Sequence, residues 1–156
     1  MKVSNALQGV TKLSVDTSAL IHLAYGNPRS AEGWKSILSR VEKDQVSLVG
    51  SCVVIVEMLA TQEAISDYAT DVEEALALLD LLDLLDLNQE IAHTAAAIRR
   101  DYALATPDAI HFATAAHARC EAFLTADRDF LRVAGYPLPW APTRTLNVIL
   151  IQELSA

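Results

Sequence analysis

Short apolar runs alternate along this chain with longer stretches in which apolar residues recur at the helical period. The short runs predict strands at residues 12–15, 46–49, 84–87, 122–124 and 146–151. The longer stretches predict helices at about 17–25, 30–43, 52–64, 69–83, 89–102 and 106–118, and a helical turn at 128–133. Strands that alternate with helical crossovers predict an α/β fold with an open parallel sheet of about five strands, flanked by helices.

Two segments allow more than one interpretation. Residues 53–56 are β-branched and fit a strand as well as a helix, but a parallel sheet needs a crossover here, which favours the helix. Asp80, Asp83 and Asp86 are three residues apart, so on one helix they would share a solvated arc. We expect that helix to end near Asp83.

Helix starts and turns complete the prediction of local structure. Thr17 or Ser18 can cap the first long helix, and Thr106 can cap the helix that begins at Pro107. Residues 135–143, GYPLPWAPT, hold too much proline for regular structure. We expect one domain over residues 1–156, with 1–10 as an extension before the first strand and 134–144 as a proline-rich loop before the last.

Composition narrows the class of protein. The chain has 156 residues, 52% of them hydrophobic, and a formal charge of −8, which excludes binding of nucleic acid by a broad basic surface. Cys52 and Cys120 lie far apart in apolar segments and are interpreted as small core residues. No segment has the ~18 apolar residues of a membrane span or the pattern of a signal peptide, so we expect a cytoplasmic protein and no membrane partner.

Acidic residues follow the predicted strands. Asp16 ends the first strand and Asp127 follows the strand at 122–124, and ligands of open α/β sheets bind beyond these carboxyl ends. Glu57 interrupts an apolar helix, and Asp108 lies in the first turn of the helix from Thr106. Each acid also has a simpler interpretation, namely a solvated helix face for Glu57, a favourable dipole interaction for Asp108 and a turn or cap for Asp127.

Together these acids predict a metal site. Carboxylates gathered at one edge repel one another, which a hard divalent cation would offset. Oxygen ligands favour Mg²⁺ or Mn²⁺ over zinc, for which the histidines lack ligand-pair spacing. Such ions can generate a hydroxide nucleophile and stabilise a phosphoryl transition state, so the set indicates hydrolysis of a phosphodiester.

The same residues carry a family resemblance. VDTSAL at Val15–Leu20, the isolated Glu57, PDAIHFATA at Pro107–Ala115 and LTADRDF at Leu124–Phe130 resemble, in order and spacing, the four acidic motifs of the PIN domain, especially VapC-type toxin ribonucleases. The resemblance implies a five-stranded parallel sheet and a Mg²⁺- or Mn²⁺-dependent endoribonuclease. It departs from the family in the ten or so residues before the first strand and in the long GYPLPWAPT connection.

The resemblance also implies roles and partners. Asp16, Glu57, Asp108 and Asp127 would be the catalytic, metal-binding acids, and Ser18 and Thr125 hydroxyls near the metal or phosphate. Asp129 is a further candidate for contact with the substrate or the ligand residues. The partners implied are an RNA substrate, a second copy in a homodimer, and an antitoxin whose tail blocks the acidic pocket.

Other functions remain open. A haloacid dehalogenase-type phosphatase needs a second Asp where this chain has Ser18, and a receiver domain needs a late lysine, whereas the last lysine is Lys43. A PIN fold with weak activity that serves as an RNA- or protein-binding regulatory module is the main alternative.

His111, one turn beyond Asp108, could contact substrate or an acid, although a structural histidine is the simpler interpretation. Surface roles explain four arginines that could meet phosphates, namely Arg99, Arg100, Arg128 and Arg132.

Overall fold

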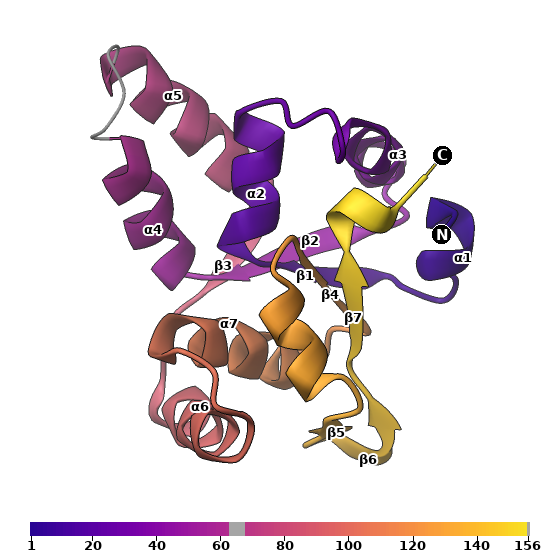
Figure 1. Ribbon diagram of the computed structural model, residues 1–156, viewed down its shortest axis with the longest axis vertical. Helices are drawn as coiled ribbons and strands as arrows, with labels where there is room; N and C mark the ends of the chain where they lie inside the picture. Colours follow the sequence, from indigo (N-terminus) through magenta and orange to yellow (C-terminus); the bar gives the residue numbers. More distant parts are fainter. Residues whose placement is uncertain (63–67, 156) are drawn as a thin grey trace.

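A five-stranded, all-parallel sheet forms the centre of the protein in the computed structural model, which describes residues 1–62 and 68–155 (Figure 1). The strands are β1 Lys12–Val15, β2 Ser47–Ser51, β3 Leu82–Leu85, β4 Ala122–Thr125 and β7 Asn147–Leu150. They lie in the order β3-β2-β1-β4-β7, and each neighbouring pair is parallel. The predicted α/β fold with a five-stranded parallel sheet is confirmed.

Helices cover both faces of this sheet (Figure 1). One face carries α1 Val3–Ala6, α2 Thr17–Ala24, α3 Ala31–Glu42, α4 Val53–Gln62 and α5 Tyr68–Leu79. The other face carries α6 Gln89–Tyr102, α7 Thr106–His117 and the 3₁₀ helix η1 Arg128–Val133. A second 3₁₀ helix, η2 Ile151–Glu153, follows β7.

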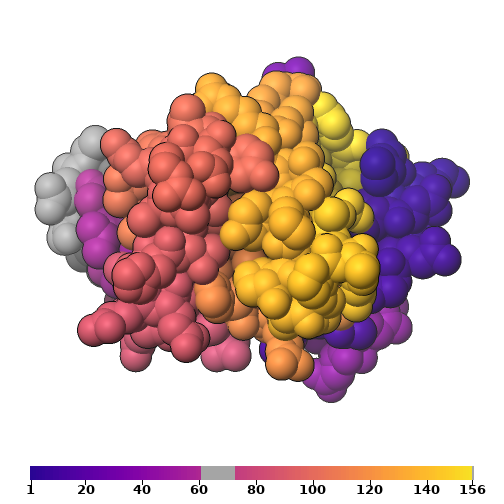
Figure 2. Space-filling model, turned by 90° about the horizontal axis from the view of Figure 1, so that it is seen from below, coloured from indigo at the N-terminus to yellow at the C-terminus, as the bar shows by residue number. Residues whose placement is uncertain are grey.

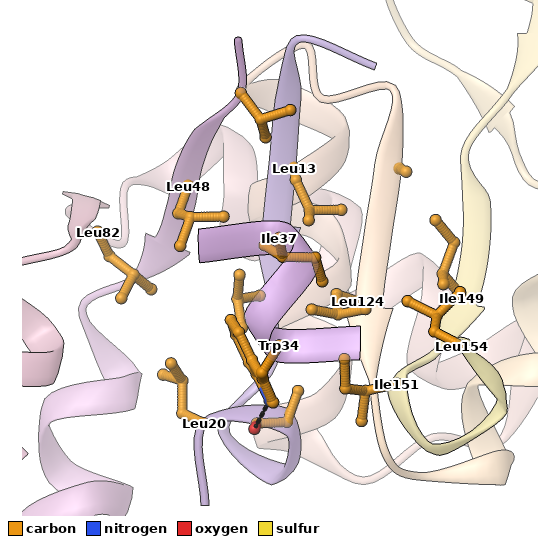
Figure 3. Close-up of a cluster of buried hydrophobic side chains, with 14 of the residues drawn as sticks. Leu13, Leu20, Trp34, Ile37, Leu48, Leu82, Leu124, Ile149, Ile151 and Leu154 are labelled. Carbon is orange, nitrogen blue, oxygen red and sulfur yellow. Dashed lines mark hydrogen bonds between the residues drawn. The ribbon is translucent and has the colours of Figure 1, made fainter. Parts of the chain in front are cut away.

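The first core is built around α3 (Figure 3). Trp34 and Ile37 are fully buried against sheet residues that include Leu13 and Leu124. The Trp34 indole N–H donates to the backbone carbonyl of Ala19 at 3.0 Å, so its one polar atom is satisfied inside the core.

The second core holds α7 against the sheet. Its alanines allow close approach, and Phe112 from this helix contacts Phe123 of β4 edge-on, with ring centroids 5.3 Å apart. Phe130 of η1 packs 4.7 Å from Phe123. Because α7 is buried along most of its length, the position of its first turn is fixed relative to the ends of the strands.

The helical connections change from one face of the sheet to the other between β3 and β4. Strands β1, β2 and β3 are added in one direction with helices on the first face, and the chain then passes through α6 and α7 on the second face to β4, on the other side of β1. The strand order therefore reverses between β1 and β4. In open α/β sheets ligands bind at such a reversal, outside the carboxyl ends of the strands.

Several predicted boundaries are corrected. The helix predicted to end near Asp83 ends at Leu79, and the strand follows at Leu82–Leu85 because the turn at Asp80 reverses the chain earlier. Strand β2 continues through Gly50 to Ser51. The prediction of helix at residues 63–64 lies outside the described residues.

The proline-rich loop is also corrected. It forms an antiparallel pair, β5 Pro137–Leu138 with β6 Ala141–Thr145, rather than an irregular loop. Each of these strands has only one partner, so the prolines stand where no second ladder requires their missing N–H. Trp140, at the tip, donates its indole N–H to the Ala116 carbonyl at 3.0 Å, which anchors this pair of strands to α7.

The predicted caps are partly wrong. Asp16, not Thr17 or Ser18, occupies the N-cap position of α2, and Ala105 rather than Thr106 precedes α7, in each case with no side-chain cap. Pro107 is therefore the second helical residue. The hydroxyls of Thr17 and Ser18 therefore do not cap α2 and make other contacts.

Packing of the C-terminal segment against α3 gives a test of the fold. A Cβ at Gly33 would lie 3.1 Å from Leu154 Cβ and 3.2 Å from the Ile151 carbonyl oxygen, both poorly movable. Gly33→Val is expected to lower the free energy of unfolding by about 2 kcal/mol or more, because the added methyls overpack this contact. Lys35→Val, exposed on the same helix, changes it by less than about 0.5 kcal/mol and is the control for helix propensity. Urea unfolding measures both, and equal losses would contradict this packing.

Candidate active site

Asp16 lies at the end of β1, at the reversal of strand order. Its residue is 3% exposed, and its backbone N–H donates to the Leu124 carbonyl at 2.8 Å. Its carboxylate Oδ2 accepts hydrogen bonds from the hydroxyls of Ser18 at 2.6 Å and Thr125 at 2.8 Å. A buried carboxylate is costly unless donors satisfy it, and these two hydroxyls do so.

The same hydroxyls tie Asp16 to the segment that follows β4. The Ala126 N–H donates to Ser18 Oγ at 2.9 Å, and the Asp127 N–H donates to Thr125 Oγ1 at 3.0 Å. Asp127 Oδ1 in turn accepts the Asp129 N–H at 2.8 Å and caps η1. The alternative interpretation of Asp127 as a cap is confirmed, and the network joins its backbone N–H to the Asp16 carboxylate through the Thr125 hydroxyl.

Asp108 enters from the first turn of α7 and is half-buried. Burial, together with the negative charges of Asp16, Asp127 and Glu57, raises the pKa of Asp108 to about 6, although His111 opposes the shift. Each of these groups is near enough to act on Asp108 through a partly desolvated space. The structure therefore brings all four predicted acids to the same edge of the sheet.

Glu57 reaches this edge from α4. Its side chain is 33% exposed, and Oε1 accepts hydrogen bonds from the Thr17 hydroxyl at 2.9 Å and from His111 Nε2. The hydrogen bond from His111 lowers the pKa of Glu57 despite partial burial, with a smaller contribution from Thr17. The alternative that Glu57 lies on a solvated helix face is wrong, because its carboxylate accepts hydrogen bonds from two groups on other helices.

His111 is the buried base of this cluster. It is 2% exposed, its Nε2 lies 4.0 Å from Asp16 Oδ1, and its Nδ1 has no hydrogen-bond partner among the described residues. Burial lowers the pKa of His111, but the hydrogen bond to Glu57 and the nearby carboxylates outweigh it and raise the pKa above its ordinary value.

The prediction of site residues missed two members. Thr17 was expected only as a cap, and His111 was interpreted as structural, yet both contact Glu57. The spacing of Asp108 and His111, one helical turn apart, is the signal that places both on one face of α7. Asp129 is exposed, and its carboxylate pairs with Arg132 at 3.2 Å, at the rim rather than within the cluster.

The donor set fits a hard divalent cation in kind. Four carboxylates and two hydroxyls supply oxygen, and the raised pKa of Asp108 shows negative charge that a cation would neutralise. Among the described residues, no three or more His, Cys, Asp or Glu side chains are arranged so that they could hold a metal ion as they stand. The fit is therefore one of ligand chemistry and charge.

The sequence itself decides the family. Residues 13–136 match the PIN domain. The chain belongs to the PIN domain family. The match runs from β1 through β4 and includes all four candidate acids, whereas β5, β6 and β7 lie beyond it. A search of curated proteins finds none that matches.

Solved structures show the same PIN fold. A structure of VapBC2 from Rickettsia felis bound to a promoter DNA fragment contains a chain with a TM-score of 0.69 and 12% identity, over 90% of this chain and 98% of that one. A chain of DNA-bound VapBC from Salmonella typhimurium has a TM-score of 0.68 and 16% identity, over 90% of this chain and 98% of that one. A chain of a toxin-antitoxin complex from Klebsiella pneumoniae has a TM-score of 0.60 and 25% identity, over 89% of this chain and 97% of that one.

Within the part of this PIN domain that the structure describes, no helix has the length and apolarity to span a bilayer.

The electrostatics of the PIN site predict a cost in stability. Because the folded state raises the pKa of Asp108 from 3.8 to about 6, the folded state binds the proton more tightly, and stability falls as pH rises from about 4 to about 6. Asp108→Asn is expected to stabilise the metal-free protein at pH 7 by about 1 kcal/mol, a value discounted for partial exposure.

Urea unfolding in chelator from pH 4 to pH 8 measures this effect. The two proteins should converge in stability near pH 4 and separate above pH 6. Glu74→Gln on α5, which removes an exposed acid away from the site, is the control for net charge. A destabilised Asp108→Asn at pH 7 would show that this carboxylate is not under repulsion.

Proposed function

We propose that this PIN domain is a divalent-metal-dependent endoribonuclease and the toxin of a type II toxin-antitoxin pair. The observation that carries the proposal is geometric: Asp16, Glu57, Asp108 and Asp127 lie near one another where the strand order reverses, and hydroxyl donors hold Asp16 and Glu57 in place. A group of acids that destabilises the folded protein at neutral pH has a use if a cation binds there.

Asp16, Glu57, Asp108 and Asp127 would hold the cation, which we take to be Mg²⁺, with Mn²⁺ as a substitute. When bound, it would supply a water molecule of lowered pKa and charge stabilisation for a phosphoryl group. The protein's own contribution is orientation. Donors hold three of the four carboxylates, because Ser18 and Thr125 hold Asp16, Thr17 and His111 hold Glu57, and the backbone N–H of Asp129 holds Asp127.

RNA is the proposed substrate, bound at the edge of the acidic site. The chain's formal charge of −8 leaves little attraction for a polyanion, so phosphates would need local cations. Arg132 lies at the rim, where it binds the Ala103 carbonyl at 3.1 Å and Asp129 at 3.2 Å. Asp129 would orient this arginine toward a phosphate beside the cleavage site.

The proposed protein partners are an antitoxin and a second copy of the chain in a homodimer. Several structural neighbours are chains of toxin-antitoxin assemblies, including VapBC-5 from Mycobacterium tuberculosis, and they cover nearly the whole PIN domain. A cytoplasmic location follows from this role, because an RNA-cleaving toxin acts where its RNA is.

RNA digestion tests the proposal directly. Purified protein with Mg²⁺ or Mn²⁺ is expected to give discrete new 5′ and 3′ ends in total bacterial RNA, mapped by end sequencing. Asp16→Asn and Asp108→Asn should lower the rate by at least about 100-fold, since each would remove a charge that positions the reacting centre. Asp83→Asn, which changes an exposed acid in β3, should cleave as the wild type does.

The outcomes separate the two candidate functions. Metal-dependent cuts that both site variants lose support the nuclease. The alternative, a PIN fold used as a binding module with weak activity, predicts RNA or protein binding without cuts and equal behaviour of wild type and Asp108→Asn. It is kept because the described acids do not form a ready metal-binding group.

A further inference from the structure

We propose that His111 and Thr17 are positioning residues that together hold the Glu57 carboxylate at its place in the site. Neither would be a ligand or a catalytic residue. The inference rests on the proposed function, since it concerns one of the proposed metal-binding acids. It assigns a purpose to a buried histidine that the proposed chemistry does not use.

Three helices meet at one carboxylate oxygen. Glu57 Oε1, on α4, accepts the Thr17 hydroxyl from α2 at 2.9 Å and His111 Nε2 from α7. The two donors are themselves 3.3 Å apart. Thr17 and His111 are both buried, so their positions are fixed by packing, whereas the Glu57 side chain is one-third exposed. The rigid partners therefore determine where the flexible one lies.

The protonation of the imidazole follows from this geometry. A carboxylate only accepts hydrogen bonds, so Nε2 carries the hydrogen that Glu57 receives. The other nitrogen, Nδ1, is buried and has no partner among the described residues. An unsatisfied buried polar atom costs stability, so packing alone favours an apolar residue at position 111. The imidazole at this position donates a hydrogen bond to Glu57, which an apolar side chain could not do.

Hydrogen bonds from Thr17 and His111 restrict the rotamers that the Glu57 side chain can adopt. Ordering a glutamate side chain costs conformational entropy, and a ligand that is already ordered avoids that cost when it binds a cation. Hydrogen-bond partners of metal ligands in other proteins change affinity by about 10–100-fold when removed. The same range is expected here.

Matched variants test the proposal. His111→Phe and Thr17→Val remove the donors and keep the side-chain shape, whereas His111→Gln and Thr17→Ser keep a donor at a similar reach. Mn²⁺ affinity is measured by calorimetry and electron paramagnetic resonance on full-length protein, with thermal unfolding as the check of folding. The first two variants should bind Mn²⁺ about 10–100-fold more weakly, and the last two should keep most of the wild-type affinity.

A second background shows whether the effect passes through Glu57. In Glu57→Ala protein, adding His111→Phe should cause no further loss of Mn²⁺ affinity. A loss of the same size in both backgrounds, or full affinity in both apolar variants, overturns the proposal. If His111→Phe fails to fold, the Thr17 pair decides the question alone.

A readout without metal separates this proposal from the proposed function. The imidazole ¹⁵N spectrum of the metal-free wild type should show hydrogen on Nε2, and Glu57→Gln should shift that signal. An unshifted signal contradicts the contact. If the wild type binds no Mn²⁺ but Glu57→Gln still shifts the imidazole signal, the proposed function is contradicted while the contact with Glu57 stands.

Discussion

Repulsion among carboxylates at one edge of the sheet is the constraint on which the rest of this structure depends. The four acids come from separate parts of the chain. The charges of Asp16, Glu57 and Asp127 nevertheless all act on Asp108 and, together with burial, raise its pKa. Such an arrangement opposes folding at neutral pH. It persists because the surrounding packing holds it, as strained sites in proteins generally do.

The fold supplies that packing through two buried layers. The first core, around Trp34, sets α2 and hence Thr17 and Ser18 beside the end of β1. The second core buries α7 and so fixes both Asp108 and His111 relative to the strands. Because the strand order reverses between β1 and β4, the two layers place their acidic residues at the same edge of the sheet. Site and fold are thus consequences of one topology.

Hydrogen bonds then compensate part of the electrostatic cost. Hydroxyls of Ser18 and Thr125 satisfy the buried oxygen of Asp16, and Asp127 is held by its own capping bond to η1. Burial first, and then the charges of Asp16, Asp127 and Glu57, raise the pKa of Asp108. The site therefore combines fixed carboxylates with one whose charge the protein does not neutralise, which is the condition in which a cation would be bound.

The strands and most helices could be predicted from the sequence because hydrophobic periodicity reports burial directly. Strand β1 and helix α6 match the prediction, since local residues determine both. The early end of α5 and the β5–β6 pair could not be predicted in this way, because leucine runs and proline-rich segments do not reveal their tertiary partners. The four acids were found from their place after strands and in helices, but not the contact between His111 and Glu57, which joins residues 54 apart.

The central claim is that these carboxylates bind a divalent cation, and anomalous diffraction from crystals soaked in Mn²⁺ tests it most directly. We expect a Mn²⁺ peak at about 2.0–2.3 Å from oxygens of Asp16 and Asp108, with Glu57 and Asp127 in its immediate surroundings. The same soak of Asp108→Asn crystals should give a much weaker peak. A Mn²⁺ peak away from these acids, or none at saturating concentration with the acids ordered, would contradict the account.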